Sequence, residues 1–229
     1  MSTERAYLAL ILDAPMQSWG FSSRFQRRTT GLHPTKSGVV GMICAAMGLA
    51  KGSAAERTAL EELSRVRMTS IVIPRQRRDR WTGEEKPLSV LRLEDYHTVL
   101  KTRAASGGIK KDAVVTHRQY LLDAKFGVIL AGDKALLEGI AEALRNPVWG
   151  IWFGRKNCIP AEPVCRGVFG AEEEALKELV GDIPKDAFTR VEESSFDAGN
   201  DTWSDAPPSS YKGMRPWPVR RINQVVGQK

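Results

Sequence analysis

The sequence is poor in the residues that build disulfide frameworks and metal centres. It holds three cysteines with no Cys-x-x-Cys pair, and three widely spaced histidines with no His-x-His or His-x-x-x-His pair. This scarcity argues against a disulfide-stapled scaffold and against a zinc knuckle. We therefore expect no metal, no cofactor, packed non-reactive thiols, and a reducing compartment, the cytoplasm.

Long apolar runs and internal repeats are also missing. No apolar stretch reaches the roughly 18 residues that span a membrane, and the first residues lack the basic, apolar and small-residue order of a secretory signal. Hydrophobic residues make up 42% and charged residues 27% of the chain, which are ordinary values for a globular protein. We expect a folded protein without a membrane partner.

Positive charge is what the chain has in surplus. Lys and Arg number 34 against 27 Asp and Glu, a net charge of +7. Residues 14–51 hold five basic residues and no acidic one, residues 74–118 hold eleven and six, and residues 171–205 hold three and eleven. Solvated surface charge explains the total, but it explains this segregation less well. Concentrated positive segments predict a nucleic acid as the partner.

The apolar pattern predicts an α+β fold. The runs that favour strands are 7–12, 67–73, 126–131 and 148–153. The helical periodicities begin at Thr35 or Ser37, at Ala54 and at the capping residue Asp133. This βαββαβ order is that of a ferredoxin-like or RRM-like domain. The aromatic residues that the last strand would place in the core are Trp149, Trp152 and Phe153.

A long insertion interrupts this order between residues 74 and 117. A compact domain rarely holds so long a connection without a functional reason. Apolar residues suggest strand arms at 88–93 and 96–100, and Gly107-Gly108 marks a turn. We predict a basic, β-rich thumb within a domain of residues 1–163. Residues 164–229, with an acidic helix at 172–180 and a last strand near 219–226, are predicted to form a small C-terminal subdomain.

The start of the first helix is a candidate phosphate site. A helix amino end favours an anion, and Lys36 and Ser37 would add a charge and a hydroxyl donor. The segment is not a P-loop, because Thr30 and Thr35 stand where that motif needs glycines. A plain helix cap by Thr35 or Ser37 stays open as the second interpretation.

Residues of the thumb allow a second function, RNA cleavage without a metal. His117, with Tyr120 and Lys111 nearby, would move protons while the 2′-hydroxyl of the RNA attacks. The simpler interpretation is a hydrogen-bonding or stacking histidine in a basic region. Aromatic rings among the basic segments would stack on RNA bases or lie in the core; these are Trp19, Phe21, Phe25, Trp81, Tyr96 and Tyr120.

Five short blocks, in order across about residues 7–160, are similar to a known family. They are Pro-Met-Gln-Ser-Trp-Gly at 15–20, Pro-Thr-Lys-Ser-Gly at 34–38, Asp-Tyr-His-Thr-Val-Leu at 95–100, Arg-Gln-Tyr-Leu-Leu-Asp-Ala at 118–124 and Gly-Arg-Lys-Asn-Cys at 154–158. Together they resemble the CasD-type proteins of the Cas-five family, from the subtype I-E CRISPR Cascade. The acidic C-terminal segment matches no block of that family.

The resemblance implies a fold and a function. Members of the family have an RRM-type domain with a thumb and a small C-terminal part, and they grip the 5′ handle of the crRNA without cutting it. The implied neighbours are a CasC-type backbone subunit and a CasA-type large subunit, with target DNA reached through the assembled complex. A related branch does cut RNA, so an endoribonuclease acting on precursor crRNA stays as the alternative. The residues that the resemblance assigns to the handle are Gln17, Trp19, Lys36, Ser37, Gly38, Tyr96, His97, Arg103, His117, Arg118 and Tyr120.

Overall fold

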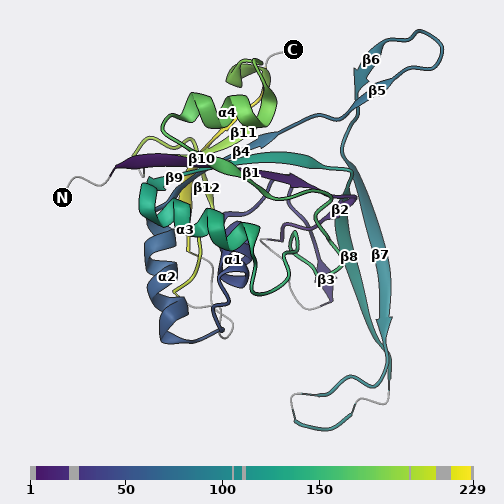
Figure 1. Ribbon diagram of the computed structural model, residues 1–229. Coiled ribbons are helices and arrows are strands. Elements are labelled where there is room, and N and C mark those ends of the chain that lie inside the picture. Colours follow the sequence, from purple (N-terminus) through teal and green to yellow (C-terminus); the bar gives the residue numbers. More distant parts are fainter. Residues whose placement is uncertain are drawn as a thin grey trace.

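A seven-stranded antiparallel sheet forms the centre of the molecule (Figure 1). The computed structural model describes residues 4–20, 26–104, 106–109, 112–195, 197–209 and 218–227. In spatial order the strands are β10 (Cys165–Phe169), β1 (Arg5–Asp13), β9 (Lys125–Asp133), β4 (Arg67–Val72), β11 (Arg190–Glu193), β13 (Arg220–Val225) and β12 (Asp201–Trp203). The predicted α+β class is confirmed.

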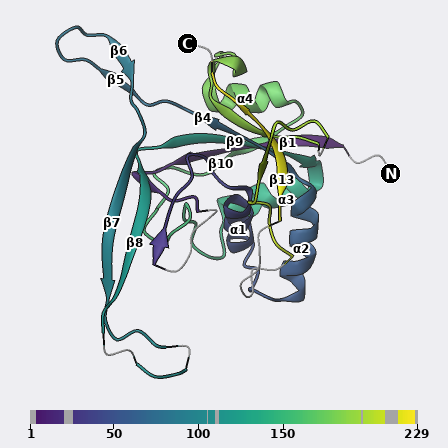
Figure 2. The same cartoon turned by 180° about the vertical axis from the view of Figure 1, so that it is seen from behind.

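Helices cover both faces of this sheet. Figures 1 and 2 show α1 (Lys36–Ala46), α2 (Ala54–Arg65) and α3 (Lys134–Arg145) on one face and α4 (Glu172–Val180) on the other. Leu8 and Leu10 of β1 pack into the cluster on the first face, whereas Ala9 and Ile11 pack into the cluster on the second. Because side chains alternate along a strand, a strand buried on both faces is apolar throughout. A short 3₁₀ helix, η1 (Lys185–Ala187), follows α4 along the chain.

The helix boundaries follow their predicted capping residues. Thr35 precedes α1, and its Oγ1 accepts a hydrogen bond from the Gly38 amide at 3.3 Å. Asp133 caps α3 in the same way, through the Leu136 amide at 3.1 Å. Gly181, with φ at +71°, ends α4, because a residue without a Cβ adopts this left-handed conformation without strain. Each helix therefore begins or ends where local chemistry requires it.

The predicted strand at 148–153 is wrong. Its first amides bond to the end of α1 instead of to a strand: Val148 N–H donates to the Ala46 carbonyl at 2.9 Å, and Trp149 N–H to the Ala45 carbonyl at 3.3 Å. These carbonyls lie in the last turn of α1, where they lack partners within the helix. Phe153 is buried as expected, but the side chain of Trp149 is 45% exposed. The sheet position beside β1 belongs to β10.

The chain beyond residue 163 adds four strands to the central sheet. Besides β10, these are β11, β12 and β13, which extend the sheet beyond β4. The last strand was predicted at 219–226 and is confirmed as β13, and the acidic helix is confirmed as α4. The short strands β11 and β12 were not predicted, because their acidic and polar residues carry no apolar alternation. The domain boundary at residue 163 stays a prediction.

The insertion forms two arms instead of one thumb (Figure 1). Both leave the same corner of the molecule and project in opposite directions, as the reverse view in Figure 2 also shows. One arm is the hairpin of β5 (Gln76–Arg78) and β6 (Glu85–Pro87). The other pairs β7 (Leu91–Val99) with β8 (Val114–Leu122), and the short strands β2 (Met16–Gln17) and β3 (Arg27–Arg28) also join β8.

The long arm corrects the predicted strands of the insertion. The two expected arms at 88–93 and 96–100 mostly fall within the single strand β7, whose partner is β8. The Gly107-Gly108 turn is confirmed: Gly107 has φ at +88°, and Arg103 and Ile109 form a bridge across it. A turn at the arm's end needs such a left-handed residue, so the glycine position predicted the tip.

His33 packs near two aromatic rings. Its ring centroid is 6.0 Å from that of Phe126 and 6.3 Å from that of Trp203, and its Nδ1 lies 3.4 Å from Ser70 Oγ. Burial lowers the pKa of His33 to about 4. The imidazole is therefore neutral at physiological pH and contributes as a packing group.

We expect His33→Gln to reduce the acid sensitivity of the fold. The unfolded chain binds the proton of this histidine below about pH 6.5, whereas the folded protein binds it only near pH 4. The free energy of unfolding should therefore fall as the pH drops between these values, by at most about 3 kcal/mol for this residue. Urea titrations of both proteins at about pH 7 and about pH 4.5 measure the difference. An identical pH dependence in the two proteins would contradict this role.

Candidate nucleic-acid interface

The amino end of α1, where the sequence predicts a phosphate, is occupied by groups of the protein itself. Lys36 N–H donates to the carboxylate of Asp205 at 3.0 Å, and Ser37 N–H donates to the carbonyl of the same residue at 2.8 Å. The Gly38 amide is taken by Thr35. These amides are the donors that a helix start leaves open, and an anion would need them. The capping interpretation therefore describes this helix end.

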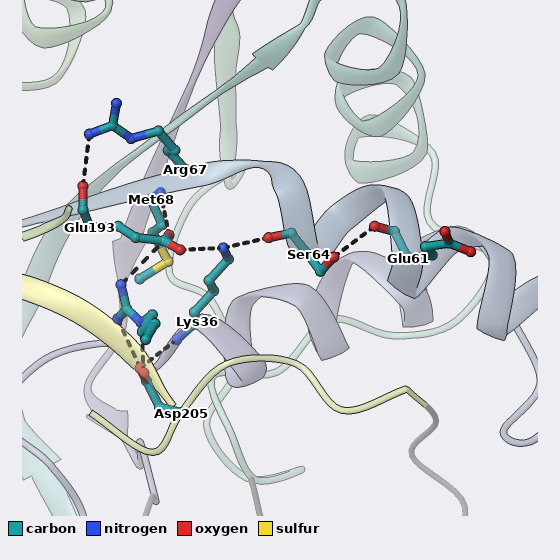
Figure 3. A network of polar contacts seen from close by, with 8 residues as sticks. Lys36, Glu61, Ser64, Arg67, Met68, Glu193 and Asp205 are labelled. Atoms are coloured by element: carbon teal, nitrogen blue, oxygen red, sulfur yellow. Dashed lines mark hydrogen bonds and ion pairs between the residues drawn. The ribbon is translucent and has the colours of Figure 1, made fainter. Parts of the chain in front are cut away.

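The Lys36 side chain points into the protein (Figure 3). Its Nζ donates to the Ser64 carbonyl at 3.0 Å and pairs with Glu193 Oε1 at 2.8 Å, and the side chain is 3% exposed. Burial lowers the pKa of this ammonium, and the contact with Glu193 opposes that shift. The ammonium thus lies inside the structure instead of on the surface where the prediction placed it, because Glu193 of strand β11 supplies its carboxylate partner.

A buried network of charges joins α1 to the C-terminal strands (Figure 3). Arg220 of β13 donates to both carboxylate oxygens of Asp205, at 2.6 and 2.9 Å. Glu193 of β11 accepts from the Met68 amide of β4 at 3.0 Å and lies 3.8 Å from Arg220. We call Lys36, Glu193, Asp205 and Arg220 the buried charge network. Four segments distant in sequence meet in it.

Gln17 and Trp19 are structural residues of the same region. The Gln17 amide donates to the Leu12 and Ala124 carbonyls at 2.9 and 2.6 Å, and its oxygen accepts from Trp19 Nε1 at 2.9 Å. Both side chains are buried, and a Cβ at Gly38 would lie 3.0 Å from the Trp19 ring. Their polar atoms and surfaces are consumed within the protein, so neither side chain presents a stacking face to solvent.

A groove of about 1110 Å³ opens along the side of α1. Its floor is the small-residue face of the helix, with Gly38, Gly41 and Ala45 spaced along it, and Ser37 lies beside them. Basic lining residues come from three different segments and are Arg28, Lys51, Arg155 and Lys156. Glu56 is the one acidic residue among the described lining residues, and its carboxylate accepts from the Gly52 amide at 2.6 Å. The groove is therefore cationic.

Two tryptophans on the segment after α3 complete the groove wall. Trp149 is 45% exposed, and Lys156 lies 5.8 Å from the ring centroid of Trp152. Gly154 fixes the position of this segment: its φ is +93°, and a Cβ would lie 1.8 Å from the Ser18 carbonyl oxygen. Only glycine permits that approach. Rings and ammonium groups side by side are what base stacking and phosphate pairing require.

Tyr120 supports Arg155, one of the basic residues that line the groove. The guanidinium donates to the carbonyls of Gln119 and Arg28 at 3.1 and 2.9 Å and lies 4.5 Å from the centroid of the Tyr120 ring. Tyr120 is buried, and its hydroxyl accepts from the side-chain Nδ2 of Asn157 at 3.2 Å. Tyr120 therefore acts through packing and a cation–π contact, which hold Arg155 in place.

One face of the long arm carries polar and aromatic groups in solvent. Tyr96 is directly opposite His117 in the β7–β8 pair, and their ring centroids are 5.3 Å apart in an edge-on contact. His117 Nδ1 lies 3.0 Å from Glu94, and hydrogen bonds from Gln119 and His117 hold the pKa of Glu94 below its ordinary value. Tyr96 is 65% exposed. This face presents a ring that a partner can reach.

The predicted proton-transfer pair is not assembled. His117 and Tyr120 are three residues apart on β8, so their side chains lie on opposite faces of the arm. Tyr120 is buried against Arg155, whereas His117 contacts Glu94 and Tyr96. Proton transfer needs two groups within hydrogen-bond reach of one substrate. Lys111, the third residue predicted to take part in RNA cleavage, lies outside the described residues. Phe21 and Phe25, predicted to stack on bases or to lie in the core, also lie outside them.

The remaining predicted residues are spread along the arm. Arg118 lies on the face opposite His117, and its Nε donates to Thr116 Oγ1 at 3.1 Å. His97 is on that same face, with Nδ1 3.9 Å from Asp95, and Arg103 is exposed near the tip. The arm therefore separates the predicted residues over two faces and its far end.

Sequence reasoning missed most of the groove's basic and aromatic lining. Trp149 and Trp152 were assigned to the core because they stand in an apolar run that resembles a strand. Arg155 and Lys156 do lie in one of the five family-like blocks, and Arg28 and Lys51 belong to the segment noted for its surplus of positive charge. A basic pair directly after a Trp-rich segment was the signal that would have identified this wall.

Neither a membrane-spanning helix nor a metal cluster is found in the part of the chain that the structure describes. No helix there is long and apolar enough to cross a bilayer. No group of three or more His, Cys, Asp or Glu residues there is arranged to hold a metal ion. The three cysteines are free thiols, and burial raises the pKa of Cys44 to about 12, well away from a reactive thiolate.

Comparison with known proteins finds one family. The model of the family described as CRISPR-associated protein (Cas_Cas5) matches residues 7–227. A curated protein of Escherichia coli (strain K12), the "CRISPR system Cascade subunit CasD", is 31% identical over 175 residues, which cover 74% of either chain.

Solved structures share this fold. A chain of a "CRISPR RNA-guided surveillance complex" superposes with a TM-score of 0.72 at 28% identity, over 96% of this chain and 89% of that one. A structure described as "Crystal structure of Cas protein" gives a TM-score of 0.65 at 28% identity, over 96% and 94%.

We expect Asp205→Asn to destabilise the protein by about 3 kcal/mol. The substitution leaves the buried Arg220 guanidinium without its carboxylate and weakens the contact at the start of α1. Urea unfolding measures the loss. Asp182→Asn is the matched control, because its ion pair with Lys177 is exposed on both sides and should contribute less than about 1 kcal/mol. Equal effects of the two substitutions would show that the buried charge network does not hold the fold.

Proposed function

The chain belongs to the Cas5 family of CRISPR-associated proteins, and we propose that it is the RNA-binding subunit of a Cascade-type surveillance complex, where it holds the 5′ handle of the crRNA. One observation carries this proposal: the groove along α1 combines four basic residues with two tryptophans, and its one described acidic lining residue is already hydrogen-bonded. Single-stranded RNA needs this combination, since cations neutralise its backbone while rings stack on its bases.

We assign the parts of the interface by their accessibility. Lys156 is exposed, so we place it and Lys51 at the phosphates, with Arg28 beside them. The exposed ring of Trp149 is the stacking surface. Gly38 and Ser37 line the floor of the groove; the missing side chain of Gly38 leaves room for the Trp19 ring, which packs against the helix there.

The long arm supplies the second part of the RNA contact. Tyr96 and His117 form one exposed face, and Arg103 lies near the tip. His97 and Arg118 face the other way, so we propose that the RNA passes across the edge of the arm. Gln17, Trp19, Tyr120 and Lys36 act from behind the surface, by holding the groove walls and the start of α1 in position.

We propose that the subunit binds RNA without cutting it. The alternative, a metal-independent endoribonuclease, needs His117 and Tyr120 to act on one phosphodiester. Their positions on opposite faces of β8 argue against that, and the contact between His117 and Glu94 favours a positioning role.

The chain order supports a finer description of the fold and of the assembly. The spatial order β10-β1-β9-β4, with helical crossovers after β1 and β9, favours a ferredoxin-like domain, extended by the C-terminal segment. We propose the same partners that the family resemblance implies: crRNA, a CasC-type backbone subunit, a CasA-type large subunit and, through them, target DNA. A cytoplasmic location follows from these partners.

Replacing Lys156 should weaken binding to handle-bearing RNA several-fold. Loss of one phosphate contact should also lower the slope of log affinity against log salt by about 0.7, the value for one charge on a single strand. Titration of Lys156→Ala and wild type with labelled RNA over a salt series measures both quantities. Lys177→Ala, on α4 at the opposite face of the sheet, is the charge-matched control and should bind as wild type does. A salt slope near zero for the wild type would remove the electrostatic basis of the proposal.

Repeat RNA incubated with the purified protein in EDTA should remain intact and bound. The measurement is a denaturing gel of end-labelled RNA beside a native gel of the same mixture. Product that appears with wild type and disappears with His117→Ala would overturn the non-catalytic assignment and support the endoribonuclease.

A further inference from the structure

Trp81 is the most exposed large apolar residue of the described chain, and its position is well defined by hydrogen bonds. Its side chain is 96% exposed at the tip of the β5–β6 hairpin. Asp79 Oδ1 accepts from the amides of Trp81 and Thr82 at 2.8 and 3.1 Å. The Asp79 amide donates to the Glu84 carbonyl, and the Gly83 amide to the Asp79 carbonyl. These hydrogen bonds order the backbone of the turn that carries the exposed indole.

Basic residues are concentrated on the same hairpin, at Arg77, Arg78, Arg80 and Lys86. Arg77 is directly opposite Lys86 in the β5–β6 pair. Like charges in such positions repel. Lys86 is paired with Glu84 at 3.4 Å and with Asp79 at 3.9 Å, whereas Arg77 has no such partner among the described residues. Arg77 and Arg80 are exposed and form no ion pair with any residue that the structure describes. The hairpin that carries the indole thus also carries two guanidinium groups that no described carboxylate pairs with.

The base of the hairpin is anchored, which fixes where its tip lies. Arg75 pairs with Asp13 of β1 and donates to the Asp123 carbonyl at 2.7 Å, and the Leu88 amide donates to the Arg75 carbonyl at 2.7 Å. A two-stranded hairpin alone is marginally stable in water. The anchored base and the ordered turn define this arm, which projects from the corner of the molecule (Figure 1).

The chemistry around Trp81 favours a nucleic acid over a protein surface. Tryptophans that anchor protein interfaces are enclosed by a ring of contacts that excludes water. Between residues 77 and 86, Trp81 is the only apolar side chain, and its neighbours are charged, Thr or Gly. A lone exposed indole on a hairpin that also carries guanidinium groups provides the combination that stacks on a base and pairs with the adjoining phosphates.

We propose that the β5–β6 hairpin is a second RNA contact, in which Trp81 stacks on a base of the guide on the 3′ side of the handle while Arg77 and Arg80 bind phosphates. This inference rests on the proposed function, because it takes the handle as the segment already bound. The two arms diverge, so the hairpin cannot reach the nucleotides at the long arm's tip (Figures 1 and 2). The same strand is the favoured occupant, since a bound handle keeps its continuation at a high effective concentration.

The test uses the full chain and two RNAs: the handle alone, and the handle with a single-stranded extension at its 3′ end. Trp81→Ala should weaken binding to the extended RNA by about tenfold and leave binding to the handle unchanged. Trp81→Phe should restore most of the loss, because a phenyl ring also stacks. Ile183→Ala, at another exposed apolar position, is the matched control and should bind both RNAs as wild type does.

The outcomes separate this inference from the proposed function. If Trp81→Ala binds the extended RNA as wild type does, while Lys156→Ala weakens binding to both RNAs, the hairpin contact is wrong and the groove stands. If Trp81→Ala keeps full RNA affinity but no longer copurifies with the protein subunits of the complex, the hairpin binds protein, which also overturns the inference. If the wild type binds neither RNA, both proposals fall.

Discussion

The rest of the interface depends on one contact, the hydrogen bond between the Asp205 carboxylate and the amino end of α1. The carboxylate accepts from the Lys36 amide, and Arg220 holds both of its oxygens. A negative charge at this helix end is favourable, and here a residue 169 positions away in the chain supplies it. The C-terminal strands are thereby joined to the first helix, and a phosphate is excluded from the site that its sequence suggests.

Because the helix end is closed, the open surface of α1 is its side, along which the cationic groove runs. The small residues on that side leave a floor without bulky side chains, and the segment at 148–156 becomes a wall of the groove by bonding to the last turn of α1. The hydrogen bonds from the Val148 and Trp149 amides therefore have two consequences. They satisfy carbonyls in the last turn of the helix, and they place Trp149 and Trp152 beside Lys156 in the groove wall instead of in the predicted core.

The insertion shows how strand geometry distributes chemistry. On β8, His117 faces Tyr96 in solvent, while Tyr120, three residues on, packs inward against Arg155. The alternation of the strand alone therefore divides residues that are close in sequence between an exposed face and a packed one. The division of the insertion into two arms gives the protein two separate surfaces from one corner, one with the Tyr96 face and one with Trp81.

Local sequence was enough to predict α1 to α4, the strands β1, β4, β9 and β13, and the turn at Gly107, because caps, apolar periodicity and glycine act over a few residues. The surplus of positive charge was enough to predict a nucleic acid as the partner, whereas RNA in particular was predicted from the aromatic residues among the basic segments and from the family resemblance. The tertiary structure alone decided that Lys36 turns inward to Glu193, that β10 takes the sheet position expected of residues 148–153, and that Trp149 is exposed. The reason is that each of these depends on which distant segment supplies a partner, and a local sequence pattern does not specify which distant segment will pack beside it.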